Sequence, residues 1–346
     1  MVIKKLSIAI LFFVSATAAS AQDIHFSQFN ETPQLLNPGA TGVYSGYLRA
    51  IVNYKNQWTA MGNAFNTVAA SFDMPLFDKN EKKAHLGAGI NFFSDKAGDS
   101  KFGLTQANLC LAGILPVDKN GSKLSMGISI GEAQHKANLS ALSWGNQYDG
   151  QGFNTALNSN ETTPVNSFNY FDLGAGLYYE YSNGQVKFTR NETRKLAVGV
   201  SYYHLNRPTQ KYFNVTEKLY GKLVVNALGT FDVKDSKISF LPSAIYFQQG
   251  KSSEITAGCA IKYRIRNDTK ITGLMTESAI AVGIHYRYND AVIPSVYFST
   301  GDFYIGISYD VNVSSYKSAT KSKGGAEISL RYNILKGALF KQKNMI

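Results

Sequence analysis

Long stretches of this chain alternate strictly between large apolar residues and small or polar ones. In residues 124–131, every second side chain is Leu, Met or Ile, and the side chains between them are Ser or Gly. The same period of two recurs in residues 84–92, 280–287, 305–312 and 326–333. Because successive side chains of a β-strand point to opposite faces, this period predicts strands with one apolar face and one small or polar face.

This pattern continues along the chain without a domain boundary. We count about fourteen such segments, near residues 47–58, 65–76, 84–96, 102–116, 123–135, 168–181, 194–205, 218–232, 237–248, 253–266, 279–288, 292–300, 303–313 and 325–335.

These strands predict an all-β fold, a transmembrane antiparallel β-barrel of about 14 strands with an N-terminal periplasmic segment. Many exceed the ~5–6 residues usual in soluble strands and reach the ~9–11 residues that a tilted strand needs to cross a bilayer. Charged residues make up only 17% of the chain. The chain contains no run of ~18 apolar residues, which is the length that a membrane-spanning helix requires. The alternative is a soluble sandwich, in which the apolar faces of two sheets pack together.

The first residues have the pattern of a secretory signal peptide. Lys4 and Lys5 precede an apolar run, and Ala19-Ser20-Ala21 supplies the small residues of a cleavage site. We expect residues 1–21 to be removed by Sec-type cleavage near Ala21/Gln22, and the protein to reach the outer membrane of a Gram-negative bacterium.

The mature chain then divides into three parts. Residues 22–45 form the N-terminal periplasmic segment, residues 46–336 the barrel, and residues 337–346 a C-terminal periplasmic tail. The chain has two cysteines. Cys110 falls on the polar face of its strand and Cys259 on the apolar face, so we expect two free thiols on opposite faces of the sheet.

With both chain ends in the periplasm, alternate connections fall on opposite sides of the membrane. The longest, residues 136–167, is then extracellular, as is the loop with Lys317, Lys321 and Lys323. The connections at residues 182–193 and 267–278 are periplasmic and unusually long. Long connections often carry contacts, although a solvated turn is the alternative for both.

Several local motifs resemble the PorP/SprF family of outer-membrane barrels. The quoted elements are Phe26-Ser27-Gln28, the turn at residues 37–42 that begins with Asn37-Pro38-Gly39, and Lys55-Asn56-Gln57-Trp58. Residues 143–150 (SWGNQYDG) resemble the long-loop motif of the family, and residues 324–332 its final strand. The departures are Gly39-Ala40, where the family has Ala and an aromatic residue, and Lys55 in place of Arg.

The resemblance implies a role in type IX secretion and gliding motility of Bacteroidetes-type bacteria. It implies a non-catalytic barrel that docks and anchors a secreted surface adhesin, periplasmic components of the machinery, or both. The implied partners are a large secreted surface protein bound through its C-terminal domain, a periplasmic lipoprotein or peptidoglycan-binding protein, and outer-membrane lipid and lipopolysaccharide. A passive or selective pore for small solutes is the alternative function.

Two sets of candidate site residues follow. Phe26 and Phe29 have two alternative roles, to which the sequence gives equal weight: they plug the periplasmic mouth of the barrel, or they bind a partner. The candidates for partner binding are Phe26, Phe29, Asn37, Trp58, Trp144, Tyr148, Asp149, Arg190 and Arg194. The candidates for lining the lumen share polar strand faces and are Arg49, Lys55, Lys262, Arg264, Arg266, Glu327 and Arg331.

Enzymatic and nucleic-acid functions have little support. Gly127-Ile128-Ser129-Ile130-Gly131 matches the letters of a nucleophile elbow, but that motif requires a strand, a sharp turn and a helix, whereas the alternation here continues. His85 and His285 fall on polar strand faces, where they fill the lumen. The five histidines have no metal-ligand spacing, so we expect no cofactor. We also expect no nucleic-acid partner, because basic helices and aromatic RNA-binding motifs are missing.

Overall fold

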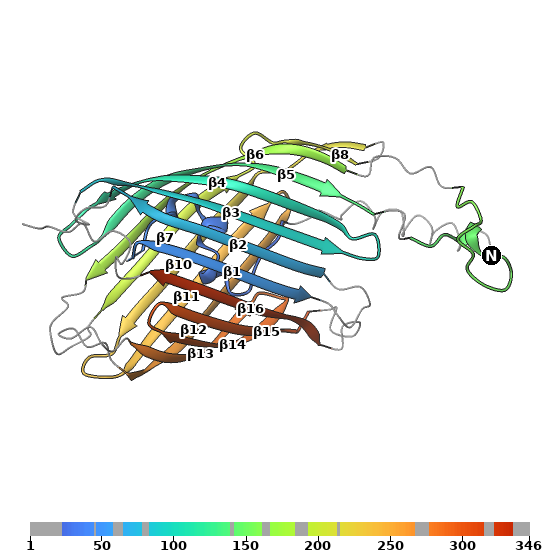
Figure 1. The fold of residues 1–346 in the computed structure, drawn as a ribbon. Coiled ribbons are helices and arrows are strands. Elements are labelled where there is room, and N and C mark those ends of the chain that lie inside the picture. The colour runs from blue at the N-terminus through green and yellow to red at the C-terminus, as the bar shows by residue number, and fades with distance from the viewer. Residues whose placement is uncertain are drawn as a thin grey trace, which may run out of the picture.

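Fourteen antiparallel strands close into a barrel in the computed structural model of this chain (Figure 1). The structure describes residues 23–44, 46–57, 65–77, 83–138, 142–160, 167–183, 193–212, 215–266, 277–314 and 322–334. Within them, no helix is both long and apolar enough to cross a bilayer.

Each barrel strand pairs with two neighbours. The strands are β1 (Leu48–Gln57), β2 (Phe65–Leu76), β3 (His85–Ala97), β4 (Phe102–Pro116), β5 (Lys123–Lys136), β6 (Ser167–Asn183), β7 (Arg194–Tyr203), β10 (Lys222–Asp232), β11 (Ile238–Gln249), β12 (Ser252–Arg266), β13 (Ser278–Arg287), β14 (Ala291–Thr300), β15 (Phe303–Asn312) and β16 (Lys323–Ile334).

The ladder between β1 and β16 closes the barrel. Its register runs from Leu48 opposite Ile334 to Gln57 opposite Gly325. This pairing satisfies the backbone groups of the two strands that would otherwise be sheet edges. A closed sheet can lie in hydrocarbon, because it exposes no unpaired edge there.

The polarity of the barrel is inverted relative to a soluble protein. On the outer face, Ile90, Val282 and Ile284 are 58–60% exposed, whereas Lys55 and Glu327 on the inner face are almost fully buried. The alternation of residues produces this arrangement, because every second side chain points outward. The prediction of an all-β barrel of about 14 strands is confirmed.

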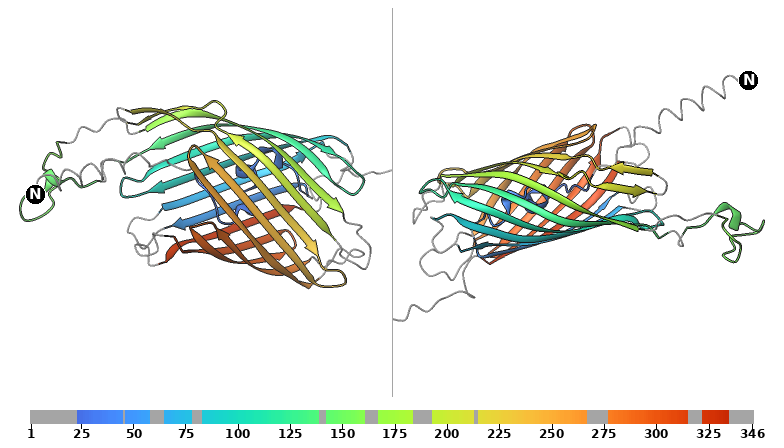
Figure 2. Two further views of the ribbon diagram at one scale, coloured as in Figure 1. Left: turned by 180° about the vertical axis from the view of Figure 1, so that it is seen from behind. Right: turned by 90° about the horizontal axis from the view of Figure 1, so that it is seen from above.

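The two ends of the barrel differ in their connections. We call the end where β1 begins and β16 ends the turn end, and the opposite one the loop end. The loop end carries the connection of residues 136–167, which includes the helical turn η6 (Gly145–Gln147). It also carries a separate two-stranded hairpin, β8 (Thr209–Tyr212) and β9 (Val215–Lys218), which lies beside the barrel wall (Figure 2).

The predicted strand segments agree with the observed ones to within a few residues, but the β8–β9 hairpin was missed. Its strands have only four residues each, which is too short for a period of two to be recognised. Cys110 lies buried on the inner face, and Cys259 lies on the outer face of β12 between Gly258 and Ala260. The predicted cysteine faces are therefore confirmed, and both thiols are free.

A charge on the outer face should destabilise the barrel according to its depth. Val282 lies at the middle of β13, so we expect Val282→Arg to lower the free energy of unfolding in lipid by about 2–4 kcal/mol. Val313, which follows the loop end of β15, is the matched control, and Val313→Arg should cost about 0–1 kcal/mol. Denaturant titration of the protein in vesicles measures both. Equal losses would contradict the assignment of the outer face to lipid.

Candidate functional site

Residues 23–43, which precede β1, run through the inside of the barrel from the loop end to the turn end (Figure 1). We call residues 23–43 the inner segment. At the loop end, the Asp23 N–H donates to Gln249 Oε1 at 3.0 Å. At the turn end, the Gly42 N–H donates to Asp73 Oδ2 at 2.8 Å. We had expected residues 22–45 to form a periplasmic segment, and the described part of it instead occupies the lumen.

Three short helical turns shape the inner segment. They are η2 (Phe29–Glu31), α2 (Pro33–Leu36) and η3 (Pro38–Ala40). Proline at the first position of α2 and of η3 fixes its backbone angle where no intrahelical hydrogen bond is lost. The Asn37 side chain accepts from the Gly39 N–H at 2.8 Å and donates to the Leu177 carbonyl of β6 at 2.8 Å. Asn37 therefore joins the turn to the wall.

Apolar side chains of the inner segment pack against the wall. Phe26 contacts Ala69 and Phe93, and Phe29 belongs to a second cluster with Val224 and Ile245. Phe26 and Phe29 are 5% and 2% exposed. Each therefore contributes about 1.5–3 kcal/mol of burial relative to an exposed side chain.

Glycines on the inner face allow the segment to approach the wall closely. A Cβ on Gly87 would lie 2.1 Å from the Thr41 carbonyl oxygen, and one on Gly127 would lie 2.4 Å from the Pro38 carbonyl oxygen. The barrel wall at these two positions can be formed only by a residue without a side chain.

A buried carboxylate binds the backbone of the inner segment near the loop end. Glu327 of β16 accepts the N–H groups of Ser27 and Gln28 at 2.7 and 2.8 Å. Two hydrogen bonds from adjacent amides fix the chain direction, and charge makes each stronger than a neutral bond.

An ion-pair network lies beside this carboxylate. The Ser27 hydroxyl donates to Asp310 Oδ1 at 2.7 Å, and the Arg287 guanidinium donates both to Asp310 at 3.0 Å and to Ser27 Oγ at 2.7 Å. The Lys55 ammonium is 3.8 Å from Asp310. Removing one member would leave a charge unpaired in a buried site, which is strongly destabilising.

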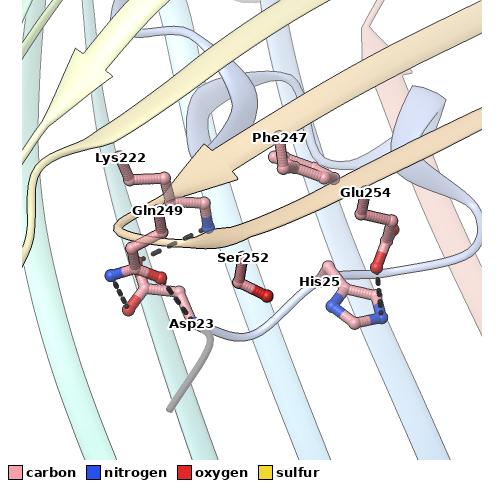
Figure 3. Close-up of a pocket in the computed structure, with 7 residues that line it drawn as sticks. All are labelled: Asp23, His25, Lys222, Phe247, Gln249, Ser252 and Glu254. Carbon is pink, nitrogen blue, oxygen red and sulfur yellow. Dashed lines mark hydrogen bonds and ion pairs between the residues drawn. The ribbon is translucent and has the colours of Figure 1, made fainter. Parts of the chain in front are cut away.

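A second charged cluster, the Asp23 cluster, holds the beginning of the segment. His204, which follows β7, contacts Asp172 Oδ1 at 2.8 Å and Asp23 Oδ2 at 2.7 Å through its two ring nitrogens. The Lys222 ammonium lies 3.5 Å from the Asp23 carboxylate, and the Gln249 side-chain amide donates to Asp23 Oδ1 at 3.1 Å (Figure 3). Burial alone would lower the pKa of His204, but the charge of Asp23 and the hydrogen bonds to both carboxylates raise it to about 9.

Polar contacts also hold the part of the inner segment that lies nearer the turn end. Glu31 accepts from the Arg331 guanidinium at 2.8 Å with both oxygens, and that guanidinium lies 4.3 Å from the centre of the Tyr304 ring. Arg49 of β1 donates to Asp73 through Nε and Nη2 at 2.9 and 2.7 Å. The last residues of the segment therefore meet a buried ion pair just before the chain enters the sheet.

Part of the lumen remains open beside the inner segment. A cavity of about 310 Å³ lies between Glu31 and the walls of β10 to β16. Its lining includes Lys262, Tyr297, Tyr304 and Arg331. This cavity lies mainly in the half of the barrel nearer the turn end. A much smaller cavity of about 20 Å³ lies at the loop end between Asp23, His25 and Glu254 (Figure 3).

The candidate partner-binding residues are not brought together. Phe26, Phe29 and Asn37 are buried in the lumen, and Arg194 begins β7 at the turn end. Trp58 and Arg190 lie outside the described residues. Trp144, Tyr148 and Asp149 lie together in the long connection at the loop end, where the Gln151 and Gly152 N–H groups donate to Asp149 and lower the pKa of its carboxyl.

Most candidate lumen residues do lie on the inner face. Lys262 and Arg331 line the larger cavity, Arg264 donates to Asp232, and Arg266 is exposed at the turn end of β12. Arg49, Lys55 and Glu327 bind the inner segment or its ion pairs.

Sequence reasoning missed the partners of these charges, namely Glu31, Asp73, Asp232, Glu277 and Asp310. It also missed Arg287 and the Asp23 cluster. Their positions carried a usable signal, because Asp310 and Arg287 occupy the polar face of strands that had been recognised. A charge that alternation directs into a barrel needs a partner there, and that requirement favours a closed or plugged lumen over an open channel.

In the described chain, the serine motif lacks the turn of a nucleophile elbow, and His85 and His285 pack on the inner face of the barrel. Ser129 lies in the middle of β5, which continues straight through residues 127–131 without a turn. His285 accepts or donates a hydrogen bond with Ser243 at 2.7 Å, and His85 is buried on the inner face. Among the described residues, no group of three His, Cys, Asp or Glu side chains could hold a metal ion.

A closed antiparallel barrel with an apolar outer face and a charged inner face defines the class: this is an outer-membrane β-barrel. The family model of the type IX secretion system membrane protein PorP/SprF matches residues 18–332. The chain belongs to that family, as its motifs indicated, and is a secretion-associated outer-membrane barrel.

Solved structures of other barrels are similar to this chain at low identity. CdiB from Acinetobacter baumannii is 6% identical with a TM-score of 0.42, and the match covers 84% of this chain and 60% of that one. The translocator domain of the autotransporter NalP from Neisseria meningitidis is 10% identical with a TM-score of 0.38, over 88% and 95% of the two chains. The deltaS2S3 mutant of the TodX monoaromatic hydrocarbon channel is 9% identical with a TM-score of 0.41, and the match covers 86% of this chain and 93% of that one. No curated protein matches the chain.

Filling the groove that holds the inner segment should displace it. Gly127→Leu places a side chain where the Pro38 carbonyl lies. We therefore expect the free energy of unfolding to fall by about 1–3 kcal/mol or more, and new protease cleavage to appear within residues 23–43. Gly113→Leu on the adjacent strand is the matched control, since a Cβ there meets nothing within 4 Å. Cleavage that is equal in the two variants would argue against a tightly held segment.

The Asp23 cluster should make stability depend on pH. The pKa of His204 is raised from its unfolded value of about 6.5, so its contribution is complete below about pH 6.5 and is lost as the pH rises through about 9. We expect the Tm of the wild type to fall more steeply than that of His204→Gln between about pH 7 and about pH 10. His285→Gln, whose partner is a serine, is the control. Parallel wild-type and His204→Gln curves would contradict the ion pairs.

Proposed function

We propose that this barrel docks and anchors a secreted surface protein, periplasmic components of type IX secretion and gliding, or both, and that it is not a catalyst. The observation that carries the proposal is the occupation of the lumen by residues 23–43. A barrel through whose whole length its own chain passes has its outer surfaces, rather than an open channel, available for function.

The energetics of the inner segment favour this proposal over a pore. Withdrawal of the segment would separate Glu31 from Arg331 and Ser27 from Asp310, and would expose the clusters around Phe26 and Phe29. Each break leaves a charged or polar group unpaired in a confined space. A pore that opened by moving this segment would have to supply that free energy.

The connection at the loop end offers a candidate surface for the secreted partner. Tyr148 and Phe153 are 61% and 51% exposed and face each other across an isolated β-bridge. Trp144 accepts the Gln147 N–H through its backbone carbonyl at 2.9 Å, and Gln147 accepts the Asn154 N–H in the same way at 2.8 Å. Exposed aromatic side chains on an internally hydrogen-bonded loop can bind a protein partner at low entropic cost.

The turn end is the proposed contact region for periplasmic partners. Barrels of this class have short periplasmic turns and longer outer loops, and this rule assigns the turn end to the periplasm. The two long connections there fall largely on residues 184–192 and 267–276, which lie outside the described residues. The implied partners are a periplasmic lipoprotein or a peptidoglycan-binding protein.

Mild-detergent purification from the native outer membrane, followed by mass spectrometry, tests docking. We expect a large surface protein or a periplasmic lipoprotein to remain bound through gel filtration. The double variant Trp144→Ala/Tyr148→Ala should weaken binding of the surface protein by roughly thirtyfold or more and so lower its recovery, since aromatic anchors typically contribute more than ~1 kcal/mol each.

The control for this experiment is Tyr288→Ala. Tyr288 is 64% exposed in the β13–β14 turn at the same end, so it reports on any general loss of aromatic surface. If the barrel is recovered alone from several gentle extractions and conducts ions in a planar bilayer without a partner, docking is wrong and the pore function stands.

A further inference from the structure

The outer face of the barrel carries an apolar groove over β1 to β6. The groove has a volume of about 670 Å³ and is hollowed where outward residues are small. Ala70 pairs with Phe92, and Phe92 with Ala107, so a large ring lies between two methyl side chains in one row. Phe72, Leu109 and Phe171 rise around the hollow. Its shape suits a flexible hydrocarbon chain.

On β3 to β5 the outer face changes from apolar to polar just above this groove, toward the loop end, except at Glu132, which lines the groove in the row of Ala107. On β3 the outward series Leu86, Ala88, Ile90 and Phe92 gives way to Ser94. In the next row Ser94 pairs with Thr105 on β4, and Thr105 with Gln134 on β5. A hydrocarbon boundary follows such a line, because an unpaired polar group in lipid costs free energy.

Lysines follow immediately beyond this boundary. Lys96 and Lys136 both pair with Gly103, so the two side chains flank a residue without one. The stem of Lys96 lies over Gly103, where a Cβ would be 3.0 Å from the Lys96 Cγ. Both are exposed on the outer face, and exposed Lys101 lies in the adjacent β3–β4 turn. Their Cα atoms are two strand spacings, or about 10 Å, apart. Two acids lie nearby: Asp99 in the same turn, and Glu132, which accepts from Asn169 at 2.9 Å.

We propose that this surface is a lipopolysaccharide-binding site, in which an acyl chain fills the groove over β1 to β6 and lipid A phosphate binds between Lys96 and Lys136. The groove and the lysines are separated by the polar row of Ser94, Thr105 and Gln134, as the hydrocarbon and phosphate parts of one lipid are separated by its sugar and ester groups. The site lies at the loop end, which the connection lengths assign to the outer leaflet.

Charge complementarity selects this occupant. Three cations stand within one turn and two strands of the same sheet, against the two carboxylates of Asp99 and Glu132. A basic residue near an anionic membrane surface is worth about one kilocalorie per mole, so losing two weakens binding roughly thirtyfold. A zwitterionic phospholipid could fill the groove but would gain little from the lysines.

The test measures lipid retained by the purified protein. Wild type and Lys96→Gln/Lys136→Gln are extracted from outer membranes in mild detergent, and bound lipid A is quantified by native mass spectrometry. We expect about one lipopolysaccharide per wild-type barrel and a large loss in the double variant. Lys119→Gln/Lys237→Gln is the control, because both lysines are exposed in turns at the opposite end.

Binding of purified lipopolysaccharide to the delipidated barrel gives the affinity, for which we expect the roughly thirtyfold change. Ala107→Leu, which fills the groove, should also weaken binding, whereas Ala257→Leu on the outer face of β12 should not. Heat-modifiable gel migration verifies that each variant is folded. Retention of phospholipid alone by the wild type, or equal retention of lipopolysaccharide by the lysine variant and its control, would overturn the proposal.

Discussion

The pairing of β1 with β16 is the constraint on which the rest of this structure depends. Water is absent from hydrocarbon, so each backbone N–H and C=O of the spanning strands must bond within the protein. Closure meets this requirement, and it also divides the side chains into an outer set that faces lipid and an inner set that faces a confined space. The charges that the sequence places on the inner set then need partners.

The inner segment supplies many of those partners. Its backbone amides bind Glu327, its serine completes the contacts of Arg287 and Asp310, and Asp23 joins His204 and Lys222. Apolar residues between these contacts pack on the wall, while the glycines of the wall leave space for the chain. Polar and apolar contacts alternate along the segment, so its position is fixed over the whole length of the lumen.

The period-two pattern was sufficient to predict the strands, their faces and the barrel, since each of these depends on local alternation. It could not predict the course of residues 23–43, which have no period and contain Pro33 and Pro38. Their location depends on contacts far apart in sequence, such as Gly42 with Asp73 and Gln28 with Glu327. Sequence motifs identified the family, and the glycines at 87 and 127 were recognised as small strand residues, but neither observation gave the path of the chain. Trp144, Tyr148 and Asp149 lie together because they are neighbours in sequence.

The direction of the inner segment has a mechanical consequence. The inner segment spans the lumen from one opening to the other, with Asp23 at the loop end and the beginning of β1 at the turn end. Tension applied at the turn end, where β1 begins, is transmitted first to the Arg49–Asp73 ion pair and to the closing ladder. Residues 23–43 could leave through that opening only if the beginning of the segment travelled the full length of the lumen. A force applied at the turn end therefore acts on the contacts of the segment one after another, beginning with those nearest β1. It does not release the whole segment in a single movement.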